Sequence, residues 1–241
     1  GPVMYDKSFS GKRNGNGKNY AVRWTAHDPS NELKLFHVLN RAKNYDDYNK
    51  AVVNLQTPGQ NVVFACKSGD IAIRTQGNFP AKWKGQGDFI MPGTDSSYMW
   101  QGMIPMDETP YQYNPERGFV SSANQHPADS VYPYYLGNNY PAPRGLIINR
   151  KLSAMQQITP QDMMAMQTDN YNVFAEMARP VFLKNIIEDV LNESERKYYN
   201  ILKNWDLRND ASSKGATVFV FAWKCFFDTV YNDEFAKING P

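Results

Sequence analysis

The sequence predicts an α+β fold in which strands and helices occupy separate regions of the chain. Two apolar runs joined by a tight turn, between Gln60 and Gly77, are the strongest β-hairpin signal. Long stretches rich in Pro, Gly and Tyr follow this hairpin, and helical periodicity with capping signals takes over after about Leu146. Strands followed by helices are typical of α+β proteins. We therefore expect a β-rich domain over residues 1–150 and an all-helical subdomain over residues 151–241.

The first elements are expected to be a hairpin and two helices. Strand-like residues at both ends of Val3–Ala26 flank a Gly-rich segment, Gly11–Lys18, which we interpret as a solvated hairpin loop. The next helix is expected over His27–Asn44, because Asp28 can cap it and is followed by a proline, which suits the first helical position. A second short helix is expected over Tyr45–Leu55.

Between the central hairpin and the helical region, the chain is rich in loops. The stretch Asn78–Glu116 is long for a connection in a compact domain, so we expect it to be functional or to wrap a core surface. The residues Gly118–Asn124 are strand-like and end in a side-chain amide. From the residues alone, Asn124 is either a turn residue at the strand end or a neutral donor pointing into a cleft. Arg150, just after an apolar run, is either a surface ion-pair partner or a site residue.

The second region is expected to open with a long helix over Ile158–Met177. Thr159, followed by a proline and then by Asp162, predicts a capping box at its start. Several methionines recur along this helix at helical spacing. They are Met163, Met166 and Met177. We interpret this methionine stripe as core packing rather than as a metal or cofactor site.

Three more helices are expected before the end of the chain. They span Val181–Leu191, Ser194–Trp205 and Ser212–Tyr231. The last of them looks like a strand locally, but its apolar residues fit a period of 3.6 better. Charged residues interrupt it and it is too short to span a membrane, so we expect a buried helix.

Composition argues against several classes of function. The formal net charge of +2 provides no bulk attraction to nucleic acid or to an anionic membrane, and we expect neither nucleic-acid binding nor membrane insertion. The two cysteines cannot form a disulfide scaffold, and the three histidines lack metal-ligand spacing. No Gly-rich phosphate loop, His-Glu-x-x-His or Gly-x-Ser-x-Gly motif is present. The residues alone therefore mark no metal site and no nucleophile.

Six blocks of the sequence, taken in order, resemble one family. They are "AVRWTAHDPSNEL", "NRAKNYDDYNKAV", "NVVFACKSGDIAIRTQGNFP", "MPGTDSSYMWQGMIPMDETPYQYNPERGFVSSANQHP", "YPYYLGNNYPAPRG" and "ITPQDMMAMQTDNY". Together they look like the β-chain of the penicillin acylase (penicillin amidase) family of N-terminal nucleophile hydrolases, and the block Met91–Pro127 is the most specific. The resemblance implies part of the sheet of such a hydrolase, and it implies amide hydrolysis.

The resemblance also implies a reaction through an acyl-enzyme. Members of this family cut themselves from a precursor and expose a serine at the start of the β-chain, whose own α-amino group serves as base. Gly1 cannot be this nucleophile, so we expect an internal segment that is inactive by itself. Its partners would be the α-chain and the rest of the β-chain, together with a small-molecule amide. Family members are commonly exported, which implies a periplasmic or secreted protein.

Four residues receive roles from the resemblance. Asn124, three residues before Pro127, falls on the family's oxyanion asparagine. Arg150 falls on an arginine that orients this asparagine and the amino terminus. Phe36 and Gln60 fall near acyl-pocket positions, and a polar residue at the second suggests a pocket not tuned purely to a phenyl group. The chemistry requires no cofactor, and a structural calcium of the full protein would take most of its ligands from outside this chain.

Two functions of different classes remain open. The first is a piece of an amidohydrolase acting on linear amides of N-acylated small molecules, either penicillin-type or acyl-homoserine-lactone-type. The alternative is a non-catalytic module that binds sugars or peptides on aromatic-lined loops, with a degenerate homologue as a third possibility. The residues do not specify the acyl group, the leaving group or the oligomeric state.

Overall fold

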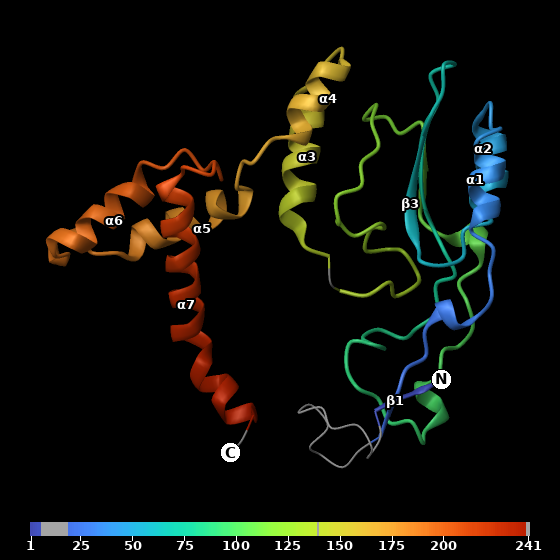
Figure 1. Cartoon of the computed structure of the whole chain (residues 1–241), viewed down its shortest axis with the longest axis horizontal. Coiled ribbons are helices and arrows are strands. Elements are labelled where there is room, and N and C mark those ends of the chain that lie inside the picture. The colour runs from blue at the N-terminus through green and yellow to red at the C-terminus, as the bar shows by residue number, and fades with distance from the viewer. Residues whose placement is uncertain (6–18, 139, 240–241) are drawn as a thin grey trace. The chain divides into compact units, whose positions relative to one another are not determined.

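The computed structural model describes residues 1–5, 19–138 and 140–239 of the 241-residue chain (Figure 1). The chain divides into two compact units, Gly1–Pro141 and Ala142–Pro241. Among the described residues, the strands and two α-helices lie in the first unit and the other α-helices lie in the second. The predicted α+β class is confirmed. The boundary expected at residue 150 falls inside a helix of the second unit.

The first unit starts with a short antiparallel hairpin. Its strands are β1 (Val3–Tyr5) and β2 (Tyr20–Ala21), as the strand-like residues predicted. The loop Gly11–Lys18 lies outside the described residues. The described 3-10 helices of the chain are η2 (Thr25–His27), η3 (Ser96–Tyr98), η4 (Met106–Glu108) and η5 (Glu188–Val190).

The helix expected over His27–Asn44 is shorter in the structure. Helix α1 spans only Leu33–Leu39, so the expected start was wrong. Asp28 does not cap it and instead forms an ion pair with Arg23 at 2.7 Å. Helix α1 begins five residues after Asp28, with Glu32 at its cap position and no side-chain cap hydrogen bond.

The expected central hairpin is confirmed and is part of a three-stranded antiparallel sheet (Figure 1). Strands β3 (Gln60–Ala65) and β4 (Ile71–Gln76) pair through their whole length. Gly69 in the turn has φ 97°, a conformation that glycine adopts without steric cost. Strand β5 (Tyr111–Tyr113) adds to the free edge of β4 and was not predicted. Three residues are too few to display an alternating pattern.

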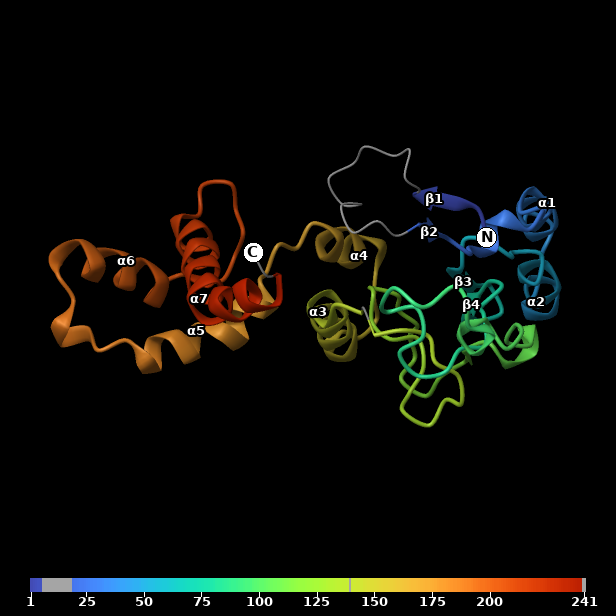
Figure 2. The same ribbon diagram turned by 90° about the horizontal axis from the view of Figure 1, so that it is seen from below.

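The core of the first unit lies between this sheet and its two helices. Helix α2 (Tyr45–Val52) begins where predicted, and the side chain of Asn44 caps it by accepting from the backbone N–H of Asp47 at 2.9 Å. Tyr48 is fully buried, and its hydroxyl donates to the carbonyl of Val62 at 2.8 Å. Burial raises the pKa of Tyr48 to about 12. Figure 2 shows α1 and α2 beside β3 and β4, where their apolar side chains form one cluster.

The residues Gly118–Asn124 do not form the expected strand. No strand among the described residues pairs with them, and positive φ angles of 71° at Gly118 and 61° at Asn124 bracket the segment. Instead of backbone pairing, the segment makes a side-chain contact with the sheet, between Asn61 and Ser122. Small side chains such as those of Ser121 to Ala123 permit extended backbone, but a strand also needs an open sheet edge in register.

The long loops of the first unit are held together by tyrosine–carboxylate contacts. The hydroxyl of Tyr134 donates to Glu108, and that of Tyr135 donates to Asp88. Each hydrogen bond to a carboxylate raises the pKa of its tyrosine. Gln86, which is fully buried, donates to the carbonyls of two residues in the segment that follows it. The loops expected to wrap a core surface are therefore ordered by specific polar contacts.

The second unit is helical, as predicted. Its α-helices are α3 (Ala142–Ala154), α4 (Pro160–Gln167), α5 (Val173–Asn185), α6 (Glu193–Lys203) and α7 (Lys214–Asn239). The predicted capping box is confirmed, because Thr159 and Asp162 each accept a hydrogen bond from the backbone N–H of the other. The prediction of a single helix over Ile158–Met177 was wrong. It is interrupted because Asn172 caps a new helix by accepting from the N–H of Ala175 at 2.8 Å.

The methionine stripe does not pack into a core, contrary to the prediction. Met163 on α4 is 44% exposed and Met177 on α5 is 51% exposed. The two lie on different helices, so their helical spacing in the sequence does not place them on one face. Other residues form the buried core of this unit. They are Ala175, Leu202, Trp205, Leu207 and Phe219.

The helices at Val181–Leu191 and Ser212–Tyr231 were predicted in part. The first five residues after Pro180 continue α5, and the chain then passes through a short 3-10 turn. Helix α7 covers the second segment from Lys214 onward, but it is not buried along its length: Phe219 packs in the core, whereas Phe227 and Phe235 are exposed. Their rings lie near that of Tyr231 along the helix, in tilted arrangements. No helix among the described residues is long and apolar enough to cross a membrane.

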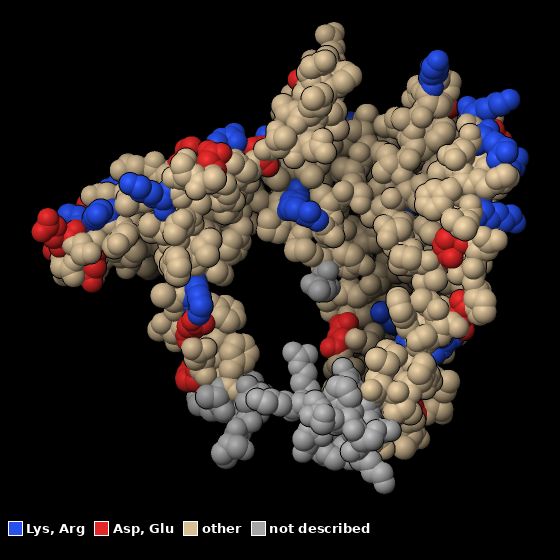
Figure 3. Space-filling model, viewed as in Figure 1, with Lys and Arg blue, Asp and Glu red and all other residues tan. Residues whose placement is uncertain are grey.

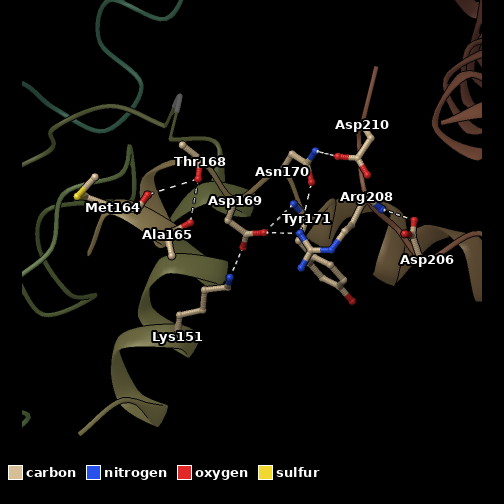
Figure 4. Close-up of polar contacts among 10 residues, drawn as sticks. All are labelled: Lys151, Met164, Ala165, Thr168, Asp169, Asn170, Tyr171, Asp206, Arg208 and Asp210. Atoms are coloured by element: carbon tan, nitrogen blue, oxygen red, sulfur yellow. Dashed lines mark hydrogen bonds and ion pairs between the residues drawn. The ribbon is translucent and has the colours of Figure 1, made fainter. Parts of the chain in front are cut away.

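A nearly buried carboxylate ties three segments of the second unit together (Figure 4). The side chain of Asp169 is only 8% exposed and forms ion pairs with Lys151 on α3 and with Arg208, the latter at 2.8 Å. Arg208 precedes α7 and also donates to the side chain of Asn170. The Lys151 ammonium and the Arg208 guanidinium hold the pKa of Asp169 below its usual range.

Asp169→Asn is expected to lower the melting temperature of the chain, and the difference should depend on pH. A carboxylate whose pKa is lower in the folded state stabilises the fold above its unfolded pKa, and loses this effect as pH falls through the folded pKa. The difference from wild type should therefore be full at pH 7 and shrink below about pH 4. Calorimetry at both pH values measures it. Asp189→Asn, which removes an exposed carboxylate, is the control, and an equal loss there would contradict the assignment.

Candidate functional site

Asn124 presents a free side-chain amide at a left-handed turn. Its φ of 61° lies in the region that asparagine tolerates better than most residues. The residue is exposed, and its side chain makes no hydrogen bond with any described residue. A primary amide carries two N–H donors and stays neutral. Such a group can donate to an anionic oxygen without changing its own protonation state.

The side chain of Gln125 closes the backbone around Asn124. Its Oε1 accepts from the N–H of Ala123 at 2.6 Å, and its Nε2 donates to the carbonyl of Ser121 at 2.9 Å. Ala123 is buried, at 6% exposure. The Gln125 amide therefore bonds to two backbone groups that precede Asn124 in the chain, and this limits the conformations open to the turn.

A second contact ties this segment to the sheet. Asn61 on β3 donates from Nδ2 to the hydroxyl of Ser122 at 2.7 Å. Its Oδ1 accepts from the hydroxyl of Thr75 on β4 at 2.6 Å, and the two residues are paired in the sheet register. The residues just before Asn124 are thereby fastened to the most regular part of the first unit. No sequence pattern pointed to Asn61 or Gln125, because their partners follow no characteristic spacing.

A second asparagine with a positive φ shows the contrasting arrangement. Asn114, with φ 43°, follows β5. Its Oδ1 accepts from the N–H of Ile71 and its Nδ2 donates to Asp70, both at 2.8 Å. Hydrogen bonding from Asn114 and Tyr113 lowers the pKa of Asp70. The amide of Asn114 is used within the fold, whereas that of Asn124 is free for an external acceptor.

The structure places the other predicted site residues as follows. Arg150 lies on α3 in the second unit and forms an ion pair with Glu176 at 2.8 Å, which agrees with its simpler interpretation as an ion-pair partner. Phe36 on α1 is 57% exposed, and Gln60 is exposed at the start of β3. Gln60 precedes Asn61 and so lies next to the residue that contacts the Asn124 segment. No described hydrogen bond, ion pair or ring contact links Phe36 to the others, and the site roles of all these residues stay predictions.

The described residues do not supply a metal site by themselves. They contain no group of three or more His, Cys, Asp or Glu side chains that could hold a metal ion. A structural calcium in the full protein stays a prediction. On the face shown in Figure 3, Lys and Arg are interspersed with Asp and Glu and do not gather into one patch.

Aromatic side chains in the loops largely contact one another. The ring of Trp83 lies 6.0 Å from the rings of both Phe89 and Tyr98, and Tyr132 packs against Tyr134 at 5.6 Å. Burial raises the pKa of Tyr132 to about 12. Rings engaged in this way stabilise the loops and leave less aromatic surface to stack on a ligand.

Comparison with known proteins shows which proteins this chain is similar to. The chain is 27% identical over 230 residues to the acyl-homoserine lactone acylase QuiP of Pseudomonas fluorescens, covering 91% of this chain and 28% of that protein. It is 25% identical over 160 residues to penicillin acylase 2 proenzyme of Pseudomonas sp., covering 66% of this chain and 20% of that protein. The chain thus spans less than a third of the length of these curated relatives.

A solved structure has a similar fold. The thermostable penicillin G acylase from Alcaligenes faecalis matches with a TM-score of 0.55 and 19% identity, covering 75% of this chain and 33% of that one. The model of the family described as penicillin amidase matches residues 1–240. Since this match extends over nearly the whole sequence, the chain belongs to the penicillin amidase family.

Proposed function

We propose that this chain forms part of an amidohydrolase that cleaves linear amides of N-acylated small molecules. Membership of the penicillin amidase family over residues 1–240 supports the hydrolase class. The observation that carries the assignment to specific residues is the free amide of Asn124 at a left-handed turn. A donor that the fold does not consume is what an oxyanion site requires.

The proposed reaction proceeds through an acyl-enzyme. The hydroxyl of an N-terminal serine, contributed from outside this chain, attacks the amide carbon and passes its proton to its own α-amino group. The carbonyl oxygen becomes an oxyanion, and the NH₂ of Asn124 donates a hydrogen bond to it. The C–N bond then breaks, the leaving amine takes the proton, and water hydrolyses the acyl-serine through a second oxyanion at the same position.

Two substrate classes follow from the names of the relatives. One similar protein is an acyl-homoserine lactone acylase and others are penicillin acylases. Both classes contain a linear amide between an acyl group and the amine of a small ring. Phe36 and Gln60 are proposed to contribute to the acyl pocket, and the polar side chain of Gln60 suits an acyl group other than a bare phenyl. The orienting role that the resemblance implies for Arg150 stays a proposal.

The proposed setting of this chain is a larger exported protein. Because the chain spans less than a third of the relatives it matches, we propose that the remaining parts of a penicillin-amidase polypeptide are its partners. They would supply the nucleophile and the ligands of any structural calcium. A periplasmic or secreted location follows from the resemblance to exported family members.

The intact protein is expected to release a primary amine from N-acyl homoserine lactones or from penicillin-type amides, whereas the 241-residue chain alone should release none. The physical reason is that the proposed nucleophile lies outside the chain. Amine release measured with a fluorogenic amine reagent, together with mass spectrometry for an acylated protein, tests both statements. Acylation of the isolated chain would contradict the proposed division of roles. An intact protein that binds sugars or peptides without turnover would instead support the non-catalytic alternative.

A further inference from the structure

The position of the Asn124 amide depends on neighbouring residues rather than on contacts of its own. The side chain makes no hydrogen bond with any described residue. The place from which this side chain extends is therefore set by the backbone alone, whose φ of 61° is left-handed. Left-handed backbone is less favourable than the right-handed or extended regions even for asparagine. Something in the fold must hold the turn in this conformation.

Gln125 is the side chain placed to hold the turn. Its two amide atoms bond to the N–H of Ala123 and the carbonyl of Ser121, and Nε2 also lies 3.3 Å from the Ser121 hydroxyl. These contacts join the residue after Asn124 to the residues before it. A backbone closed in this way has fewer ways to rotate than one held at a single point.

The closed turn is also anchored to a rigid element. Asn61 links Ser122 to the paired strands β3 and β4, with both of its amide atoms in use. Side chains that support a reacting group are most effective when they are themselves fixed by packing or hydrogen bonds. Gln125 and Asn61 thus support the segment that carries the free amide through two contacts with backbone groups and two with hydroxyls.

We propose that Gln125 is a positioning residue, which holds the turn so that the amide of Asn124 points at the oxyanion. This inference rests on the proposed function. A displacement of about 1 Å at a reacting group can lower a rate about 10²-fold. Gln125→Met keeps the length of the side chain but removes both hydrogen bonds. It is expected to lower kcat of the intact amidase about 10- to 100-fold with KM unchanged.

The decisive experiment is a double-mutant cycle with Asn124→Gly, which removes the amide but suits a positive φ. If Gln125 acts through Asn124, Gln125→Met lowers kcat in the wild-type background and has no further effect in the Asn124→Gly background. An equal loss in both backgrounds would show an independent structural role and overturn the proposal, as would wild-type kcat for Gln125→Met. Gln112→Met is the matched control and should retain kcat, because that side chain instead accepts from Arg117.

Two further measurements distinguish failure of the positioning role from failure of the proposed function. Gln125→Asn retains the amide on a shorter arm and should give an intermediate kcat, so it replaces the methionine variant in the cycle if that variant does not fold. Absence of amide hydrolysis by the intact wild-type protein would refute the proposed function itself. Normal hydrolysis by both wild type and Asn124→Gly would leave the protein an amidase but refute the positioning role, because there would be no oxyanion donor to position.

Discussion

Asn124→Ala is expected to lower kcat of the intact amidase by about 10²- to 10³-fold, which corresponds to about 2.7–4 kcal/mol of transition-state stabilisation. The amide donates to an oxygen that becomes fully anionic only in the transition state and intermediate. Its loss should therefore reduce kcat and kcat/KM equally and leave KM unchanged. Steady-state kinetics with an N-acyl homoserine lactone and with a penicillin-type amide measure the effect.

Three variants separate the amide from the backbone. Asn124→Gly removes the same donor without the steric cost of alanine at φ 61°, so it should lose as much activity as Asn124→Ala. Asn124→Asp places a carboxylate beside the oxyanion and should lose more. Asn114→Gly, at the other left-handed asparagine, removes hydrogen bonds to Ile71 and Asp70 and should lower the melting temperature while retaining kcat. Wild-type turnover by Asn124→Gly would rule out an oxyanion role.

Trp205→Ala is expected to destabilise the helical unit by about 3–5 kcal/mol, the usual cost of removing a large aromatic side chain from a core. Trp205 is 7% exposed, its ring centroid lies 5.8 Å from that of Phe219, and its Nε1 donates to the carbonyl of Arg208 at 2.9 Å. The truncation removes apolar contacts and leaves that carbonyl without its donor. Urea unfolding followed by the helical circular dichroism signal measures the loss.

Substitutions at Gly215 and Tyr198 test whether lost core packing causes the destabilisation by Trp205→Ala. A Cβ added at Gly215 would lie 2.2 Å from the Cγ of Trp205, so Gly215→Ala should also destabilise the unit, by about 1–3 kcal/mol. Tyr198→Ala removes an aromatic side chain from the exposed face of α6 and should change stability by less than about 0.5 kcal/mol. A Tyr198→Ala loss as large as that of Trp205→Ala would contradict the assignment of the core.

Local chemistry accounts for the elements that were predicted correctly. The turn after Ala65 contains Gly69 at φ 97°. Glycine adopts this conformation without steric cost, so the turn does not depend on contacts with distant strands. Thr159 and Asp162 form their capping box within one helical turn. The family could also be recognised, because the blocks that carry the resemblance are contiguous in sequence. Each of these signals lies within a few residues of the feature that it specifies.

Contacts between distant residues account for the errors. Met163 and Met177 repeat at helical spacing, but a cap at Asn172 separates them onto two helices and both remain exposed. Aromatic residues along α7 have the period of a buried helix, yet within the described residues only its first part packs into the core cluster. Periodicity reports which face of a helix is apolar and does not report what covers that face.

The two asparagines with left-handed backbone show what the sequence alone determined and what required the tertiary structure. The sequence alone was enough to identify Asn124 as a candidate oxyanion donor, by its place three residues before Pro127 in a recognisable block. Only the tertiary structure showed that the amide of Asn114 is hydrogen-bonded to Asp70 and Ile71. It also showed that the amide of Asn124 is free, and that Gln125 and Asn61 hold the segment before it. The reason is physical: a hydrogen bond such as that from Asn61 to Ser122 joins residues 61 positions apart, and its formation depends on the packing of the whole unit.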